Sequence, residues 1–315
     1  MILTDYLRST PDITWDIAIQ SGIRHGVIRL PEDEAFDVTS LSHVKEVCER
    51  YTNRGITPLI VEPLPNALHD HIKSGDELRD VSIEKFIKLM ENLKETTVDT
   101  VCFNFMAHYG WTRTADSLPE RGGARVTGFK LADFVPDNRE ISADKLWQNY
   151  EYFIRTVIPY AEKYGIKLAL HPDDPPLPSL GKVARIFTSL DAIKKGMSAV
   201  NSPNLGVTFC QACYYLMGEN VENAIKELAD KIFFIHFRNV RGNKFDFSET
   251  FHDNGELDMA RLMKVYIENG INVPIRVDHV PTLAGEAIGQ AGYDALGRLF
   301  AIGYLKGIVE ALENC

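Results

Sequence analysis

Long hydrophobic runs and an excess of basic charge are both missing from this chain of 315 residues. No stretch approaches the roughly 18 consecutive apolar residues that indicate a transmembrane helix. The formal net charge of −10 is opposite in sign to that of proteins that bind nucleic acid or anionic lipid. The opening MILTDYLRSTPDITWD has early acidic residues and lacks the apolar centre of a secretory signal. We therefore expect a cytoplasmic protein with no nucleic-acid and no membrane partner.

A disulfide framework and a glycine-rich phosphate loop are also absent. The five cysteines, at positions 48, 102, 210, 213 and 315, are odd in number and widely scattered, which does not predict disulfides. Neither G-x-G-x-x-G nor G-x-x-x-x-G-K-[ST] occurs in the chain. A doubly wound α/β sheet that binds a nucleotide is therefore less favoured than an α/β barrel.

Short apolar, β-branched segments alternate with longer helical patterns. Strands are predicted at 24–30, 57–62, 99–105, 166–171, 204–209, 231–236 and 273–279, with a weaker one at 2–6. Helices are predicted near 41–54, 83–96, 144–164, 219–229, 256–269 and 293–313. Buried strands that alternate with helices indicate a parallel sheet covered on both faces. Their number predicts an α/β fold of the (β/α)₈ TIM-barrel type.

The domain organisation follows from the same pattern. We expect one barrel domain over residues 1–315, because the barrel units continue along the whole chain. The segment at about 107–143 is the least regular part. An irregular stretch of that length inside a barrel is predicted to be an active-site lid or another excursion from the barrel.

Residues that can bind a metal ion stand at the carboxyl ends of four predicted strands. These residues are His171, Cys210, His236 and Asp278. In TIM barrels, side chains at this end of the strands reach the active site. Imidazole, thiolate and carboxylate together suit a divalent transition metal, and such a mixed set is typical of catalytic sites. The alternative for each histidine is a structural role, and Cys213, three residues after Cys210, is predicted to pack in the core.

Other polar residues near these strand ends are weaker candidates. Asp173 and Asp174 follow His171 in a proline-rich turn and could orient it or the substrate, although a simple polar turn is equally consistent. Arg238 suits a substrate carboxylate, with a surface ion pair as the alternative. His279 adjoins Asp278 and could act as a general base if the strand ends there, as Pro281 suggests.

Several longer motifs resemble one known family. They are NFM (104–106), WTRT (111–114), HPDDPP (171–176), GVTFCQ (206–211), IHFRNV (235–240), DHVP (278–281) and GYDALGRLFAIGYLKG (292–307). In combination they are similar to D-mannonate dehydratase, over most of the chain from about residue 55 onward. The resemblance implies a xylose-isomerase-like TIM barrel and a homo-oligomer, with a dimer favoured.

The resemblance also implies chemistry and residue roles. A member of this family would bind Mn²⁺, or alternatively Co²⁺, Ni²⁺, Fe²⁺ or Zn²⁺, through His171, Cys210, His236 and Asp278. It would dehydrate the sugar acid D-mannonate to 2-dehydro-3-deoxy-D-gluconate in hexuronate catabolism. The catalytic pair would be His279 and Tyr293. The expected substrate contacts are Asn104, His69, Asp173 and Arg238. A sugar isomerase or epimerase on the same barrel, and a sensor without turnover, are the alternatives.

The early loops differ from the family pattern. The family's Leu-His-His-Ile-Pro loop corresponds here to RLPEDE at 29–34, which contains no histidine. The family's Glu-Ser-x-Pro-Val-His corresponds to the longer segment from Glu62 to His69. These loops would touch the substrate more than the metal. The metal site is therefore predicted more firmly than the identity of the sugar acid.

Overall fold

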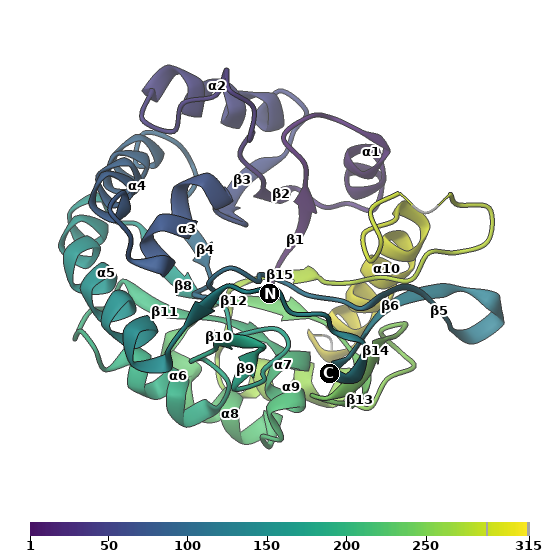
Figure 1. The fold of residues 1–315 in the computed structure, drawn as a ribbon. Coiled ribbons are helices and arrows are strands. Elements are labelled where there is room, and N and C mark those ends of the chain that lie inside the picture. The colour runs from purple at the N-terminus through teal and green to yellow at the C-terminus, as the bar shows by residue number, and fades with distance from the viewer. Residues whose placement is uncertain (288, 314–315) are drawn as a thin grey trace.

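A computed structural model describes residues 1–287 and 289–313 of the chain. In this part, eight parallel strands close into a barrel in the order β1-β15-β12-β11-β8-β4-β3-β2 (Figure 1). The strands are β1 (Ile2–Leu7), β2 (His25–Ile28), β3 (Thr57–Val61), β4 (Thr100–Phe103), β8 (Lys167–Leu170), β11 (Leu205–Cys210), β12 (Ile232–Phe237) and β15 (Pro274–Val277). All eight predicted strand segments are present, and the predicted TIM barrel is confirmed.

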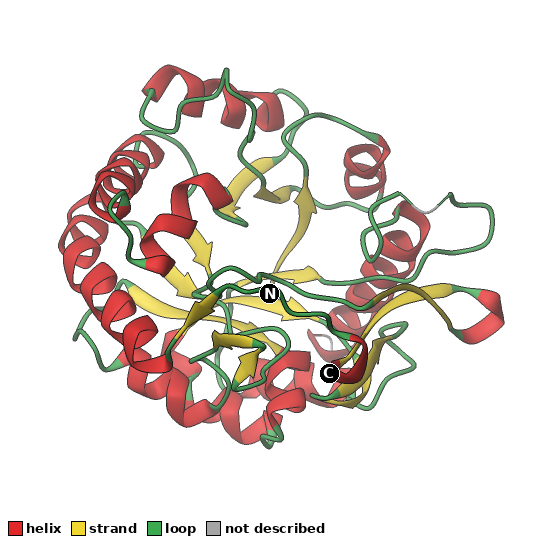
Figure 2. Cartoon of the chain, viewed as in Figure 1, coloured by secondary structure: helices red, strands yellow, loops and turns green. Residues whose placement is uncertain are grey.

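Helices surround the barrel, as Figure 2 shows in red around the yellow strands. They are α1 (Ile13–Gln20), α2 (Leu41–Thr52), α3 (Asn66–Ser74), α4 (Arg79–Leu93), α5 (Ala143–Tyr164), α6 (Leu190–Met197), α7 (Gln211–Met217), α8 (Val221–Glu227), α9 (Met259–Glu268) and α10 (Ala295–Glu313). The sequence did not predict α1, α3, α6 and α7. Each of these has nine residues or fewer, which is too short for a clear helical period. No helix in the described residues has the length and apolar character to cross a membrane.

Helix α5 shows how sequence sets an element of the outer layer. Ser142 begins it by accepting a hydrogen bond from the Lys145 backbone N–H, and Gly165 ends it in the left-handed conformation with φ 70°. Its apolar side buries Tyr150 and Phe153. Full burial of an aromatic side chain of this kind contributes about 1.5–3 kcal/mol to stability. Packing against the barrel therefore fixes α5 more firmly than helix propensity does.

The segment at 107–143 is more regular than the sequence predicted. It contains β5 (Ala115–Pro119), β6 (Arg125–Lys130) and β7 (Glu140–Ile141). Strand β6 joins β13 (Val240–Asn243) and β14 (Asp246–Glu249) in an antiparallel sheet of order β13-β14-β6-β5. Strand β7 pairs with β10 (Lys182–Ala184), which pairs with β9 (Ser179–Leu180). Strand β6 pairs with its neighbour β5 and with the distant β14, and no local pattern could reveal the second pairing.

Candidate active site at the barrel mouth

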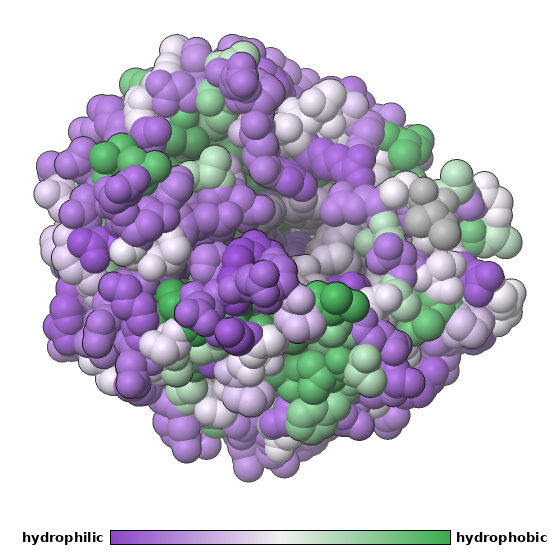
Figure 3. All heavy atoms as spheres, in the orientation of Figure 1, coloured by the Kyte–Doolittle hydropathy of each residue, from purple (hydrophilic) through white to green (hydrophobic). Residues whose placement is uncertain are grey.

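A cavity of about 430 Å³ opens at the carboxyl ends of the barrel strands. This volume lies in the range of small-molecule sites. Figure 3 shows the molecule hollowed at the centre of this face. Both halves of the barrel line the cavity; among the lining residues are Tyr6, Arg29, Glu62, Asn104, Trp111, His171, His236, Asp278, His279 and Tyr293.

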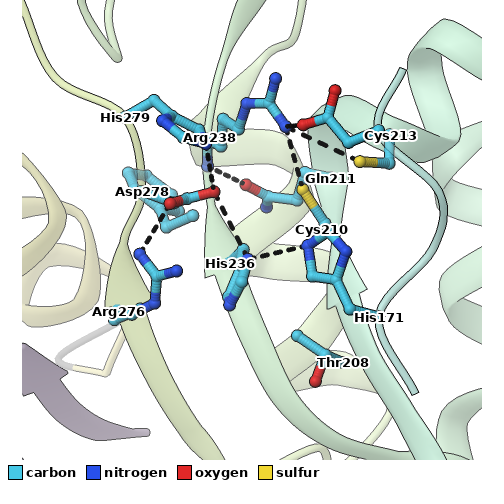
Figure 4. A network of polar contacts seen from close by, with 12 residues as sticks. His171, Thr208, Cys210, Gln211, Cys213, His236, Arg238, Arg276, Asp278 and His279 are labelled. Atoms are coloured by element: carbon cyan, nitrogen blue, oxygen red, sulfur yellow. Dashed lines mark hydrogen bonds and ion pairs between the residues drawn. The ribbon is translucent and has the colours of Figure 1, made fainter. Parts of the chain in front are cut away.

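The four predicted metal ligands come together at one side of this cavity. His171 follows β8, Cys210 ends β11, His236 lies near the end of β12 and Asp278 follows β15. Nε2 of His171 is 3.2 Å from Nδ1 of His236, which is 3.4 Å from a carboxylate oxygen of Asp278 (Figure 4). The thiol sulfur of Cys210 and the two imidazoles offer ligand atoms that all lie within 4.8 Å of one another.

This arrangement fits a divalent cation. Two atoms that each lie about 2.1 Å from one ion are separated by roughly 3.0–3.4 Å at right or tetrahedral angles. The spacings of His236 from His171 and Asp278 agree with that range. Nδ1 of His171 lies 2.6 Å from the Pro172 carbonyl oxygen, so Nδ1 is the protonated nitrogen and Nε2 presents its lone pair to the site.

The surroundings of Cys210 favour a thiolate. Burial raises the pKa of this thiol, but a hydrogen bond from Cys213 and the charge of Arg238 bring the pKa well below its ordinary value. Nη1 of Arg238 lies 3.5 Å from the Cys210 sulfur. Burial and the neighbouring Cys210 raise the pKa of Cys213 well above the ordinary value, so Cys213 stays a thiol. Cys213 is buried, as predicted, and also contacts the candidate ligand.

Arg276 binds two acidic residues of the site, and it was not among the residues predicted from the sequence. Its guanidinium binds Glu62 at 2.8 Å and Asp278 at 2.7 Å. Glu62 in turn lies 2.9 Å from Nε2 of His236. The signal was available, because Arg276 stands two residues before Asp278 on β15 and so shares its face. Arg276 therefore orients Asp278 directly, and it also contacts Glu62, which faces His236.

The predicted catalytic pair lies beside Asp278. Nε2 of His279 is 3.4 Å from a carboxylate oxygen of Asp278, and the Tyr293 hydroxyl donates a hydrogen bond of 3.4 Å to its other oxygen. Strand β15 ends at Val277, and His279 takes a left-handed φ of 47°. The side chains of adjacent residues can therefore both face the cavity, which a continuing strand would prevent.

Burial sets the protonation states of this pair. Burial lowers the pKa of His279 to about 4, against the opposing effect of Asp278 and Glu249. At neutral pH the imidazole is therefore uncharged and can accept a proton. Burial and the Asp278 charge raise the pKa of Tyr293 well above its ordinary value. The phenol therefore keeps its proton and can donate it, so the two groups are suited to opposite roles.

Of the four predicted substrate contacts, only Asn104 lines the cavity. Arg238 is fully buried and forms ion pairs with Asp174 and Glu249, so its charge is already neutralised. His69 is 2% exposed and contacts the rings of phenylalanines around it. Asp173 is fully buried and accepts hydrogen bonds from two backbone N–H groups. The structure thus places Arg238, His69 and Asp173 outside the cavity, where they support its walls.

The cavity also has lining residues that were not among the predicted site residues. Arg29 and Tyr6 come from the ends of β2 and β1. Lys73 and Trp111 line it from α3 and from the 107–143 segment. Arg29 and Tyr6 did carry a signal, because they stand at the ends of predicted strands. Lys73 and Trp111 carry none, because they reach the cavity only through the paths of α3 and of the long loop.

The fold and the site together define a TIM barrel with a candidate divalent-metal centre in its mouth. The sequence model of the family described as D-mannonate dehydratase (UxuA) matches residues 13–138 and 130–315. A mannonate dehydratase from Streptococcus uberis is 31% identical over an alignment that covers 94% of this chain and 92% of the relative. The chain belongs to the D-mannonate dehydratase family, whose members are hydro-lyases, and this confirms the resemblance seen in the sequence.

Solved structures agree with this placement. The crystal structure of mannonate dehydratase from Streptococcus suis serotype 2 has a TM-score of 0.91 at 26% sequence identity and covers 100% of this chain and 94% of that one. A D-psicose 3-epimerase from Clostridium cellulolyticum H10, covered at 99% of both chains, has a TM-score of 0.65 at 13% identity. The second likeness shows the fold alone, so the isomerase or epimerase alternative is the weaker one.

Proposed function

We propose that this protein is a metal-dependent hydro-lyase that converts D-mannonate, or a closely related aldonate, to 2-dehydro-3-deoxy-D-gluconate. The observation that carries the proposal is that an imidazole and a phenol meet at one carboxylate. His279 and Tyr293 lie on the two oxygens of Asp278, next to the other candidate metal ligands. A dehydration needs a base and an acid at adjacent carbons, and this pair supplies both.

The reaction follows from these roles. His279 accepts the proton from C2 of the substrate, and a double bond forms between C2 and C3. Tyr293 donates its proton to the C3 hydroxyl, which leaves as water, and the resulting enol becomes the 2-keto acid. A divalent ion, when bound, supplies positive charge where negative charge develops on the substrate carboxylate. With the assignment reversed, Tyr293 would have to lose a proton that its buried setting retains.

We infer that the ion would be held by His171, Cys210, His236 and Asp278, and that Mn²⁺ is the physiological metal. The mixed nitrogen, sulfur and oxygen donors also suit Co²⁺, Ni²⁺, Fe²⁺ or Zn²⁺. A role in hexuronate catabolism, a cytoplasmic location and a homodimer remain predictions from the sequence and its family resemblance. Arg276 and Glu62 would act here by orienting Asp278 and His236.

Turnover of aldonates tests the function directly. Protein treated with EDTA should be inactive on D-mannonate, and added Mn²⁺ should restore formation of a 3-deoxy-2-keto acid. A panel of aldonates would then rank D-mannonate against its epimers. Formation of a ketose or an epimer without loss of water would overturn the dehydratase proposal in favour of the isomerase alternative. Binding without any turnover would favour the sensor.

Loss of the thiolate should weaken metal binding. Cys210→Ala should reduce affinity for Mn²⁺ by more than about tenfold, because even residues that only orient metal ligands contribute that much. Elemental analysis after dialysis against limiting Mn²⁺ measures the effect. Cys48→Ala is the matched control, since Cys48 is a buried free cysteine on α2, far from the four ligands in sequence and not among the cavity residues. Equal metal content in both variants would remove Cys210 from the ligand set.

A further inference from the structure

The imidazole of His279 is held mainly by aromatic rings. Trp111 stacks on it with ring centroids 4.8 Å apart and an angle of 6° between the planes. Tyr293 contacts it edge-on, with centroids 5.2 Å apart at 68°. Two rings of different orientation therefore restrict the imidazole. Trp111 comes from the 107–143 segment, whereas Tyr293 precedes α10.

Hydrogen bonds do little to orient this ring. Nδ1 of His279 is buried, and no described residue hydrogen-bonds to it. A side chain at Gly292 would come within 3.3 Å of that nitrogen, so the glycine backbone closes this side. A histidine base is commonly oriented by a partner on its second nitrogen. The described residues supply no such partner, and the left-handed backbone of His279 also needs support from its surroundings.

Trp111 is itself anchored to a rigid part of the molecule. The guanidinium of Arg113 lies over its ring, 4.5 Å from the centroid. Arg113 is fixed by ion pairs with Asp174 at 3.0 Å and Glu249 at 2.6 Å, in which every side chain is at most 1% exposed. Trp111 is nevertheless 39% exposed and lines the cavity. Such exposure is unusual for a large aromatic side chain that serves only as core packing.

We propose that Trp111 is a positioning residue that sets the plane of the His279 imidazole for removal of the C2 proton. The inference rests on the proposed function, because it assigns Trp111 a role through the base of that reaction. Through Trp111, the 107–143 segment contributes a side chain to the active site. Arg113, Trp111 and His279 then form one continuous support from the buried ion pairs to the reacting nitrogen.

Kinetics of three variants test this role. Trp111→Ala should lower kcat on D-mannonate by about tenfold or more, because a small misplacement of a catalytic group is costly. Mn²⁺ affinity should change by less than about threefold, since the candidate ligands keep their contacts, and kcat should fall by a larger factor than KM rises. Trp111→Phe preserves a stacking ring and should recover most of the lost kcat. Trp147→Ala is the control, because Trp147 packs on Tyr150 and Phe187 in the outer layer.

Fluorescence supplies a readout that general destabilisation would not produce. The chain has three tryptophans, so the difference between wild type and Trp111→Phe isolates the emission of Trp111. Replacing His279 with leucine should change that emission, whereas the same replacement in the Trp111→Phe background should change little. Equal changes in both backgrounds would mean that the rings do not stack in solution, and would overturn the inference.

The two proposals can fail separately. Wild-type turnover of D-mannonate together with full activity of Trp111→Ala would overturn the role of Trp111 and leave the dehydratase intact. A fall in activity that Trp111→Phe does not restore, or an equal fall in Trp147→Ala, would assign Trp111 a merely structural part. Absence of turnover on any aldonate by metal-loaded wild type would overturn the proposed function, and the positioning role with it, even if fluorescence reported the stack.

Discussion

Replacing Arg238 with methionine should lower the free energy of unfolding by about 3–5 kcal/mol, because it leaves buried carboxylates without enough positive charge. Arg238 and Arg113 each form ion pairs with both Asp174 and Glu249, over distances of 2.6 to 3.0 Å. All four side chains are at most 1% exposed, so water cannot replace the missing guanidinium. Urea unfolding of metal-free protein, followed by circular dichroism, measures the loss.

Arg261→Met is the matched control for this variant. Arg261 lies on α9 and pairs with Glu222 at 2.9 Å, and the two side chains are 48% and 31% exposed. Its removal should cost less than about 1 kcal/mol, as exposed ion pairs generally do. Comparable losses in the two variants would show that the buried cluster is not a principal support of the fold.

The effect of Arg238→Met should diminish in acid. Burial raises the pKa of Asp174, but Arg113 and Arg238 lower it more, so the pKa lies below its ordinary value. The ion pairs therefore stabilise the fold above the ordinary carboxyl pKa, and this stabilisation is lost as pH falls through the lowered value. In the variant a buried carboxyl takes up a proton more readily. The difference in unfolding free energy should thus be smaller at about pH 5 than at about pH 7; a difference independent of pH would contradict this account.

Replacing Tyr293 with phenylalanine should reduce kcat by about 10²-fold or more, as loss of a general acid commonly does. The change removes only the hydroxyl that donates to Asp278 and, in the proposed reaction, to the departing C3 oxygen. The ring contacts with His279 and Tyr6 are preserved. Steady-state kinetics with saturating Mn²⁺ and D-mannonate measure the loss, and elemental analysis should find the metal content unchanged.

Tyr304→Phe serves as the control for the loss of a phenol hydroxyl. Tyr304 lies on α10 outside the cavity and contacts Phe237 and Phe300 through its ring. It should keep wild-type activity. Full activity of Tyr293→Phe would rule out the assigned role, and a fall in metal content with unchanged activity per bound ion would assign the hydroxyl to the support of Asp278 instead.

The barrel and the candidate ligands were accessible from sequence for the same reason. Strands buried on both faces read as apolar runs, and all six residues of β11 are buried. A polar residue at the end of such a run therefore marks the barrel mouth. Cys210 is the last residue of β11, and His171 directly follows β8. Of the catalytic pair, His279 was suggested by its place beside Asp278, whereas Tyr293 came from the family resemblance alone, because it precedes a helix and has no distinguishing local pattern.

Long-range contacts account for what the sequence did not reveal. Arg238 stands two residues after His236, which suggested a shared face, but β12 ends at Phe237 and the side chain turns to Glu249 on β14. His69 lies on α3, a helix too short to be predicted, and is enclosed by aromatic rings. Trp111 reaches His279 across 168 positions, as their numbers show. Such partners are defined only once the chain has folded.

The order of the strands around the barrel separates two groups of residues at its mouth, the candidate metal ligands and other residues that line the cavity. The candidate metal ligands come from four neighbouring strands, β8, β11, β12 and β15, whereas β1, β2, β3 and β4 form the other half of the circle. Arg29 and Asn104 line the cavity from that second half. Glu62, which follows β3, instead contacts His236 and Arg276 across the mouth. Substitutions of Arg29 or Asn104 would therefore change the surface offered to a sugar acid and leave the candidate donor atoms in place, whereas a substitution of Glu62 would affect both.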